Sequence, residues 1–123
     1  MSLISATNTG DMPCYPLITF TGPCVYPTLS NASIVGSPFI QFGLQMLAGD
    51  MLIVNTDPKY KSAMFYTAGS TQGSSRLYTL TQGSSFWALP PDSTSSLQFT
   101  TLDVVPVAAT CTVDYASAYS AAA

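Results

Sequence analysis

The sequence contains no histidine and no glutamate. Without histidine, neither a Ser-His nor a Cys-His pair is available to activate a nucleophile. Paired-carboxylate chemistry would fall to the six aspartates. Asp50, Asp57 and Asp92 have turn-like neighbours (Gly49, Pro58 and Pro91), and Asx-turns account for aspartates in such places. Two aspartates could still converge in space as a glycosidase pair. The residue types nevertheless favour a protein that is not an enzyme.

Positive charge is also scarce, since Lys59, Lys61 and Arg76 are the only cations in 123 residues. Three cations are too few to neutralise a run of phosphates, so binding to nucleic acid or to an anionic membrane surface is not expected. No apolar run approaches the roughly 20 residues that would span a bilayer. The first ten residues lack the basic and apolar regions of a signal peptide.

The sequence contains no motif typical of metal, phosphate or dinucleotide binding. A calcium-binding loop, a phosphate loop and a dinucleotide fingerprint are all missing, so we expect no metal and no cofactor. The three cysteines, Cys14, Cys24 and Cys111, lack metal-ligand spacing. Their usual behaviour is that of reduced thiols that pack as small hydrophobes, and a Cys14–Cys24 disulfide is the alternative.

Short β-type runs, separated by Gly, Pro, Ser and Asn about every ten residues, make up most of the chain. They predict strands at residues 16–21, 38–46, 51–55, 62–67, 76–80, 85–89, 96–102 and 110–116, and no segment fits a helical pattern. Alternating strands with one apolar face need a second sheet to cover that face. The sequence therefore predicts an all-β, antiparallel two-sheet β-sandwich over residues 16–116, preceded by an extended segment (1–15) and followed by a tail without a core pattern (117–123).

Aromatic residues next to polar ones provide the candidate contact sites. Trp87, the only tryptophan, is expected to point inward with Leu89, while Phe86 faces the other way towards a neighbour or a covering loop. If the protein binds sugar, the candidate platform residues are Tyr60, Tyr66, Tyr78 and Trp87. Two polar loops, at residues 68–75 and 90–96, are expected to face partners.

The order of short motifs resembles the C-terminal domain of siphophage distal-tail and minor tail proteins. The motifs that carry this resemblance are NTG (8–10), PLITFTGP (16–23), PTLSN (27–31), FIQFGLQML (39–47), AGDMLIVNT (48–56), FWALPPD (86–92), LQF (97–99) and TVDY (112–115). The chain departs from the pattern at Asp92, which replaces a glycine, at AGSTQGSS (68–75), which lengthens a hairpin, and at Asp114-Tyr115, which replaces an aromatic-Arg ending.

The resemblance implies a jelly-roll or galectin-like sandwich at the distal end of a long non-contractile bacteriophage tail. It further implies a virion component, assembled in the bacterial cytoplasm, whose partners are other tail-tip proteins and copies of itself in a ring. The chain has few charges and many hydroxyl and amide groups, so there is little electrostatic repulsion between copies. This composition is compatible with a subunit of a larger assembly. The alternative function is that of a carbohydrate-binding module that contacts polysaccharide on the host surface.

Overall fold

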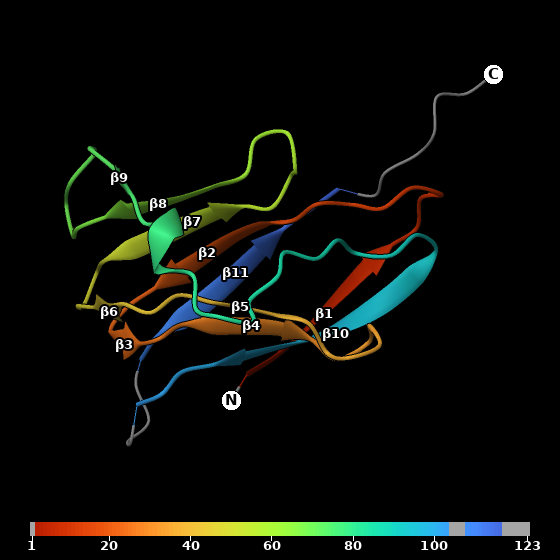
Figure 1. Ribbon diagram of the computed structural model, residues 1–123, viewed down its shortest axis with the longest axis horizontal. Helices are drawn as coiled ribbons and strands as arrows, with labels where there is room; N and C mark the ends of the chain where they lie inside the picture. Colours follow the sequence, from red (N-terminus) through yellow and green to blue (C-terminus); the bar gives the residue numbers. More distant parts are fainter. Residues whose placement is uncertain (1, 104–107, 117–123) are drawn as a thin grey trace.

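The computed structural model describes residues 2–103 and 108–116, and it is an antiparallel β-sandwich (Figure 1). One sheet has four strands in the order β1-β10-β4-β5, and the other has five in the order β11-β2-β7-β8-β9. Strands β3 and β6 form a separate small pair. The all-β two-sheet prediction is confirmed. The described residues contain no α-helix, and thus no helix long and apolar enough to cross a membrane.

The strand boundaries follow the short β-type runs of the sequence. The four-stranded sheet consists of β1 (Ser2–Asn8), β10 (Ser93–Thr100), β4 (Thr28–Asn31) and β5 (Phe39–Gln41). The five-stranded sheet consists of β11 (Thr110–Asp114), β2 (Leu17–Thr21), β7 (Met51–Asn55), β8 (Ser62–Tyr66) and β9 (Ser74–Ser75). The small pair is β3 (Cys24–Val25) with β6 (Gln45–Met46), and Leu77–Thr79 forms the 3₁₀ turn η1.

The core lies between the two sheets because alternate residues of each strand point inward. In β2 and β7 the inward residues Ile18, Phe20, Leu52 and Val54 are fully buried. Phe20 meets Phe99 of the opposite sheet with ring centroids 5.7 Å apart. Such aromatic contacts across the interior join the layers and contribute about 1 kcal/mol beyond the buried area.

Two of the motifs quoted above form tight turns. Asn8 is fully buried, and its amide donates to the carbonyls of Met12 (2.8 Å) and Leu89 (3.1 Å) while its Oδ1 accepts the N–H of Gly10 (3.0 Å). Gly49 has φ +85°, and a Cβ there would lie 2.8 Å from the Cβ of Ala68. Both the conformation and the lack of space restrict position 49 to glycine.

Three sequence-based expectations differ from the structure. Residues 76–80 were predicted as a strand, but Leu77–Thr79 form η1, in which the N–H of Leu80 donates to the carbonyl of Leu77. Residues 85–89 form no strand: Leu89 makes an isolated bridge with Cys14, and the N–H of Ser85 donates to the carbonyl of Phe39. Residues 38–46 divide into β5 and β6, because Phe42 bridges to Leu80 between them.

The extended segment predicted for residues 1–15 includes β1, which pairs with β10 from Ser2 to Asn8 and so contributes an edge strand to the four-stranded sheet. The tail predicted at 117–123 lies outside the described residues. β10 begins at Ser93, inside the segment predicted as a loop at 90–96. The segment 68–75 connects β8 to β9 and includes β9 itself, as expected of a hairpin tip.

Candidate functional site

The tyrosines predicted as a sugar platform lie in three different segments, namely the β7–β8 loop, the end of β8 and η1. Tyr60 lies in the β7–β8 loop and is 61% exposed, with the Lys59 ammonium 5.6 Å from its ring centroid. Tyr66 ends β8, whose five residues span about 15 Å at the usual rise per residue, so Tyr60 and Tyr66 lie at opposite ends of this strand. Tyr78 lies in η1 and is 77% exposed. Among the described residues, no ring–ring contact joins two of these tyrosines.

Trp87 points inward, as the sequence predicts, whereas Phe86, which was expected to face the other way, packs against the same core cluster from a half-buried position. Trp87 is 5% exposed and packs in the core with Leu89, which is fully buried. The indole Nε1 has no hydrogen-bond partner. Phe86 is half-buried, and the ammonium of Lys61 lies 5.0 Å from its ring centroid. Trp87 therefore offers no face to a sugar, and Phe86 is covered by a lysine side chain.

The carboxylates of Asp50 and Asp57 accept backbone N–H groups at turns, and that of Asp103 accepts the N–H of the distant Val25 at 3.0 Å. Asp50 is buried, and its carboxylate accepts the N–H groups of Leu47 (2.8 Å) and Ala68 (3.0 Å). Asp57 accepts the N–H of Lys59 at 2.9 Å in an Asx-turn. In residues 2–103 and 108–116, no cluster of three or more Cys or Asp could hold a metal ion.

The three thiols are free, and burial holds those of Cys24 and Cys111 in their protonated form. Burial raises the pKa of Cys111 from 9.0 to about 12. Burial, reinforced by the negative charge of Asp103, raises the pKa of Cys24 to about 11. Since the thiolate is the nucleophile, neither of these two cysteines is activated for chemistry at neutral pH.

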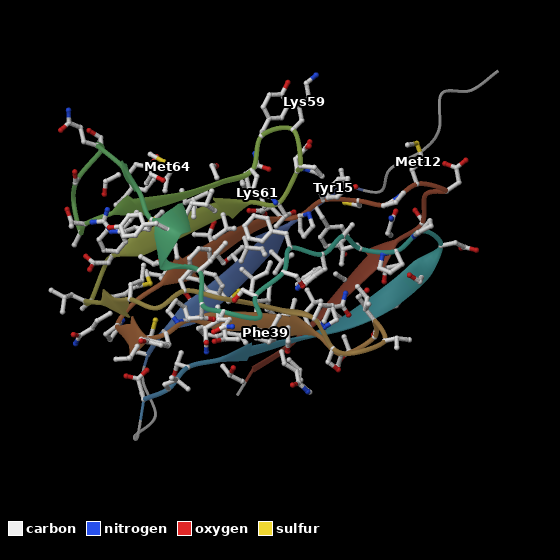
Figure 2. The ribbon with its side chains drawn as sticks, viewed as in Figure 1. Met12, Tyr15, Phe39, Lys59, Lys61 and Met64 are labelled. Atoms are coloured by element: carbon white, nitrogen blue, oxygen red, sulfur yellow. The ribbon has the colours of Figure 1, made fainter. Side chains whose placement is uncertain are left out.

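An apolar hollow lies on the outer face of the five-stranded sheet. It has a volume of about 330 Å³, and its floor is formed by Met51 and Ile53 of β7 with Tyr66 of β8. The register places Ile53 opposite Met64 and Met51 opposite Tyr66, so these four side chains share the outer face. Figure 2 shows Met64 on the side of β8 that faces away from the four-stranded sheet.

The loop between β8 and β9 forms the rim of this hollow. Thr67, Gly69, Ser70 and Thr71 line it, and the N–H of Ser70 donates to the carbonyl of Thr67 at 3.0 Å. Asp50 holds the start of the loop through the N–H of Ala68. The loop thus provides hydroxyl groups around an apolar floor.

Close packing fixes one wall of the hollow. A Cβ at Gly73 would lie 2.7 Å from Cζ of Tyr66, so the backbone of the loop approaches the tyrosine ring closely. None of the residues that line the hollow carries a formal charge at neutral pH. Such a surface suits an apolar side chain of a protein partner better than a charged ligand.

Of the predicted site residues, only Tyr66 contributes to the hollow. Met51 and Ile53 were missed because residues 51–55 form an uninterrupted apolar run, which resembles a strand that is buried on both faces. The available signal was the neighbouring strand, in which Met64 and Tyr66 are apolar or aromatic at alternate positions. No family model, curated protein or solved structure matches the chain.

Proposed function

We propose that this chain is a structural, non-enzymatic component of a bacteriophage tail tip, a β-sandwich that packs on other tail-tip proteins. The observation that carries the proposal is the uncharged apolar hollow of Met51, Ile53 and Tyr66 on an outer sheet face. A contiguous apolar surface of this kind is characteristic of protein contact sites.

The ordered motif series is the second support, and it provides the setting. Asn8, Gly10, Gly49 and Asp50 belong to these motifs, and each has a role in turn geometry. Residues of this kind specify a scaffold and its turns, with no part in chemistry. The setting in a tail therefore rests on the resemblance, and the contact surface rests on the hollow.

The experiment is to locate the protein in purified phage particles by gold-labelled antibody and electron microscopy. The proposal predicts label at the end of the tail opposite the head, and no label on particles that lack the gene. Label on the head, or no label on any particle, contradicts it.

Carbohydrate binding remains the competing function, and Tyr60 and Tyr78 are its remaining exposed rings. A panel of host cell-wall polysaccharides distinguishes the two functions in a pull-down with the purified domain. We expect no retention. Retention that is lost in Tyr60→Ala or Tyr78→Ala would favour the sugar-binding function instead.

A further inference from the structure

Strand β1 is an edge of the four-stranded sheet, and among the described residues it pairs with no strand other than β10 (Figure 1). Its sequence, SLISATN, has no charge and no proline, although exposed edges are usually protected by lysine, proline or a bulge. Leu3 is 65% exposed beside this edge. The edge therefore lacks the usual features that prevent pairing with another strand.

The hydrogen bonds of β10 show which backbone groups of β1 point outward. Ser96 lies opposite Ser5, yet its N–H donates to Ser33 Oγ (2.8 Å) and its carbonyl accepts the N–H of Ala32 (3.0 Å), both on the β4 side. Ser5 and Ser96 are therefore a non-hydrogen-bonded pair, and Ser5 directs its N–H and carbonyl away from the sheet. The same alternation gives Leu3 an outward N–H and carbonyl.

The remaining edges of the two sheets are less available. The Thr81–Ser85 region covers β5, with the N–H of Ser85 bonded to the carbonyl of Phe39 and the N–H of Thr81 bonded to that of Gln41. β9 has only two residues. β11 is open but carries the charge of Asp114.

At the far end of β1, one outward donor is already occupied. The N–H of Thr7 donates to the hydroxyl of Tyr115 at 2.9 Å, so only Leu3 and Ser5 keep a complete outward pair among the described residues. An incoming antiparallel strand is thereby confined to the first half of β1.

We propose that β1 pairs antiparallel with β1 of a second copy of this chain, centred on Ile4. In this register Leu3 faces Ser5 of the partner copy and Ser5 faces its Leu3, which gives about four backbone hydrogen bonds. Ile4, which is only half-buried in the single chain, packs against its own symmetry mate, and the two exposed Leu3 side chains become diagonal neighbours.

Because β1 carries no charge, two copies of it meet without electrostatic repulsion. A register centred on Ser5 would place Leu3 opposite Thr7 of the partner copy, and it is disfavoured because the N–H of Thr7 is already bonded to Tyr115. The contact is two-fold and closed, unlike the head-to-tail contacts that build a ring, and it does not depend on the proposed function. It joins two four-stranded sheets into one continuous sheet.

The test is sedimentation equilibrium of the purified protein from roughly 10 μM to 1 mM, a range suited to a small contact of this kind. Wild type is expected to rise from the monomer mass towards twice that mass. Ser5→Pro is expected to remain monomeric, because proline removes the outward N–H and leaves the bonds to β10 intact. Ser5→Lys should give the same result and serves if the proline variant fails to fold.

The matched control is Ser96→Lys. Ser96 lies on β10 directly opposite Ser5, so this variant adds the same charge on the same face of the sheet but not on the edge strand. It is expected to dimerise as wild type does. Hydrogen exchange at high concentration should protect the amides of Leu3 and Ser5. A wild type that is monomeric throughout overturns the proposal. A dimer that persists in both Ser5 variants also overturns it. A dimer that is lost in Met51→Lys overturns it as well, because such a dimer would form through the outer hollow and not through β1.

Discussion

The carboxylate of Asp50 links the turn before β7 to the loop after β8, because it accepts the N–H groups of Leu47 and Ala68. Both segments border the apolar hollow, one through the turn before β7 and the other through the rim loop. The sequence indicated the turn role of Asp50 from its neighbour Gly49. It could not indicate the bond to Ala68, because that contact depends on how β8 ends.

Replacement of Asp50 by alanine leaves two partly buried N–H donors without an acceptor. We expect Asp50→Ala to lower the free energy of unfolding by about 2–3 kcal/mol. Urea unfolding followed by Trp87 fluorescence measures this loss. Asp57→Ala is the control, because Asp57 accepts only the exposed N–H of Lys59, and its cost should stay below about 1 kcal/mol. Equal losses in the two variants would show that Asp50 has no special role.

Cys111 makes stability depend on alkaline pH. Its pKa is 9.0 in its ordinary environment and about 12 in the folded chain, so the unfolded thiol ionises first as pH rises. The contribution of Cys111 to the free energy of unfolding is therefore complete below pH 9. It declines between pH 9 and 12, by at most about 1.4 kcal/mol per pH unit. We expect the stability difference between wild type and Cys111→Ala to fall by about 1 kcal/mol from pH 8 to pH 10. A difference that is constant over this range contradicts the assignment.

At the scale of single elements, alternation was an accurate guide where a strand has one covered face. The strands predicted at 96–102 and 110–116 overlap β10 and β11, although β10 begins three residues earlier, at Ser93. Trp87 and Leu89 are buried as expected, although residues 85–89 form no regular strand. Residues 76–80 fit the same pattern but close into η1. The choice between these conformations was decided by tertiary partners, such as the bridge between Phe42 and Leu80, which the sequence of the segment does not contain.

The turn before β10 tests how the chain accommodates aspartate where the resembled family has glycine. Asp92 has φ +48°, and its N–H donates to the carbonyl of Gly10 at 2.9 Å. Glycine would relieve roughly 1 kcal/mol of left-handed strain and lose a similar amount through unfolded-state entropy. Asp92→Gly should therefore lie within about 0.5 kcal/mol of wild type, and Asp92→Val should lose about 1–2 kcal/mol. Equal urea midpoints for the two variants would contradict this account of the turn.

At the scale of the whole molecule, the hollow arises only when strands are assembled in register. Met51, Ile53, Met64 and Tyr66 are separated in sequence by the β7–β8 loop, and their common face follows from strand pairing. The composition, with few charges and neither histidine nor glutamate, favoured a protein that is not an enzyme. It could not show which face would remain apolar, because both faces of β7 carry apolar residues.

The outer face of the five-stranded sheet is thus the surface on which the proposed assembly role depends. Met51→Lys places a charge in the hollow, at a residue that is already partly exposed. Thr112→Lys is the matched control, because Thr112 is exposed on β11 and shares this outer face through Thr19 and Ile53. The two variants carry the same charge change, so they differ only in whether the hollow is affected.

The most direct measurement is the amount of this protein in purified phage particles, quantified by mass spectrometry for wild type and both variants. The account predicts that wild type and Thr112→Lys are incorporated equally and that Met51→Lys is reduced at least about tenfold, the effect of about 1.4 kcal/mol on a contact. Equal incorporation of all three, or absence of the wild-type protein from the particles, would contradict it.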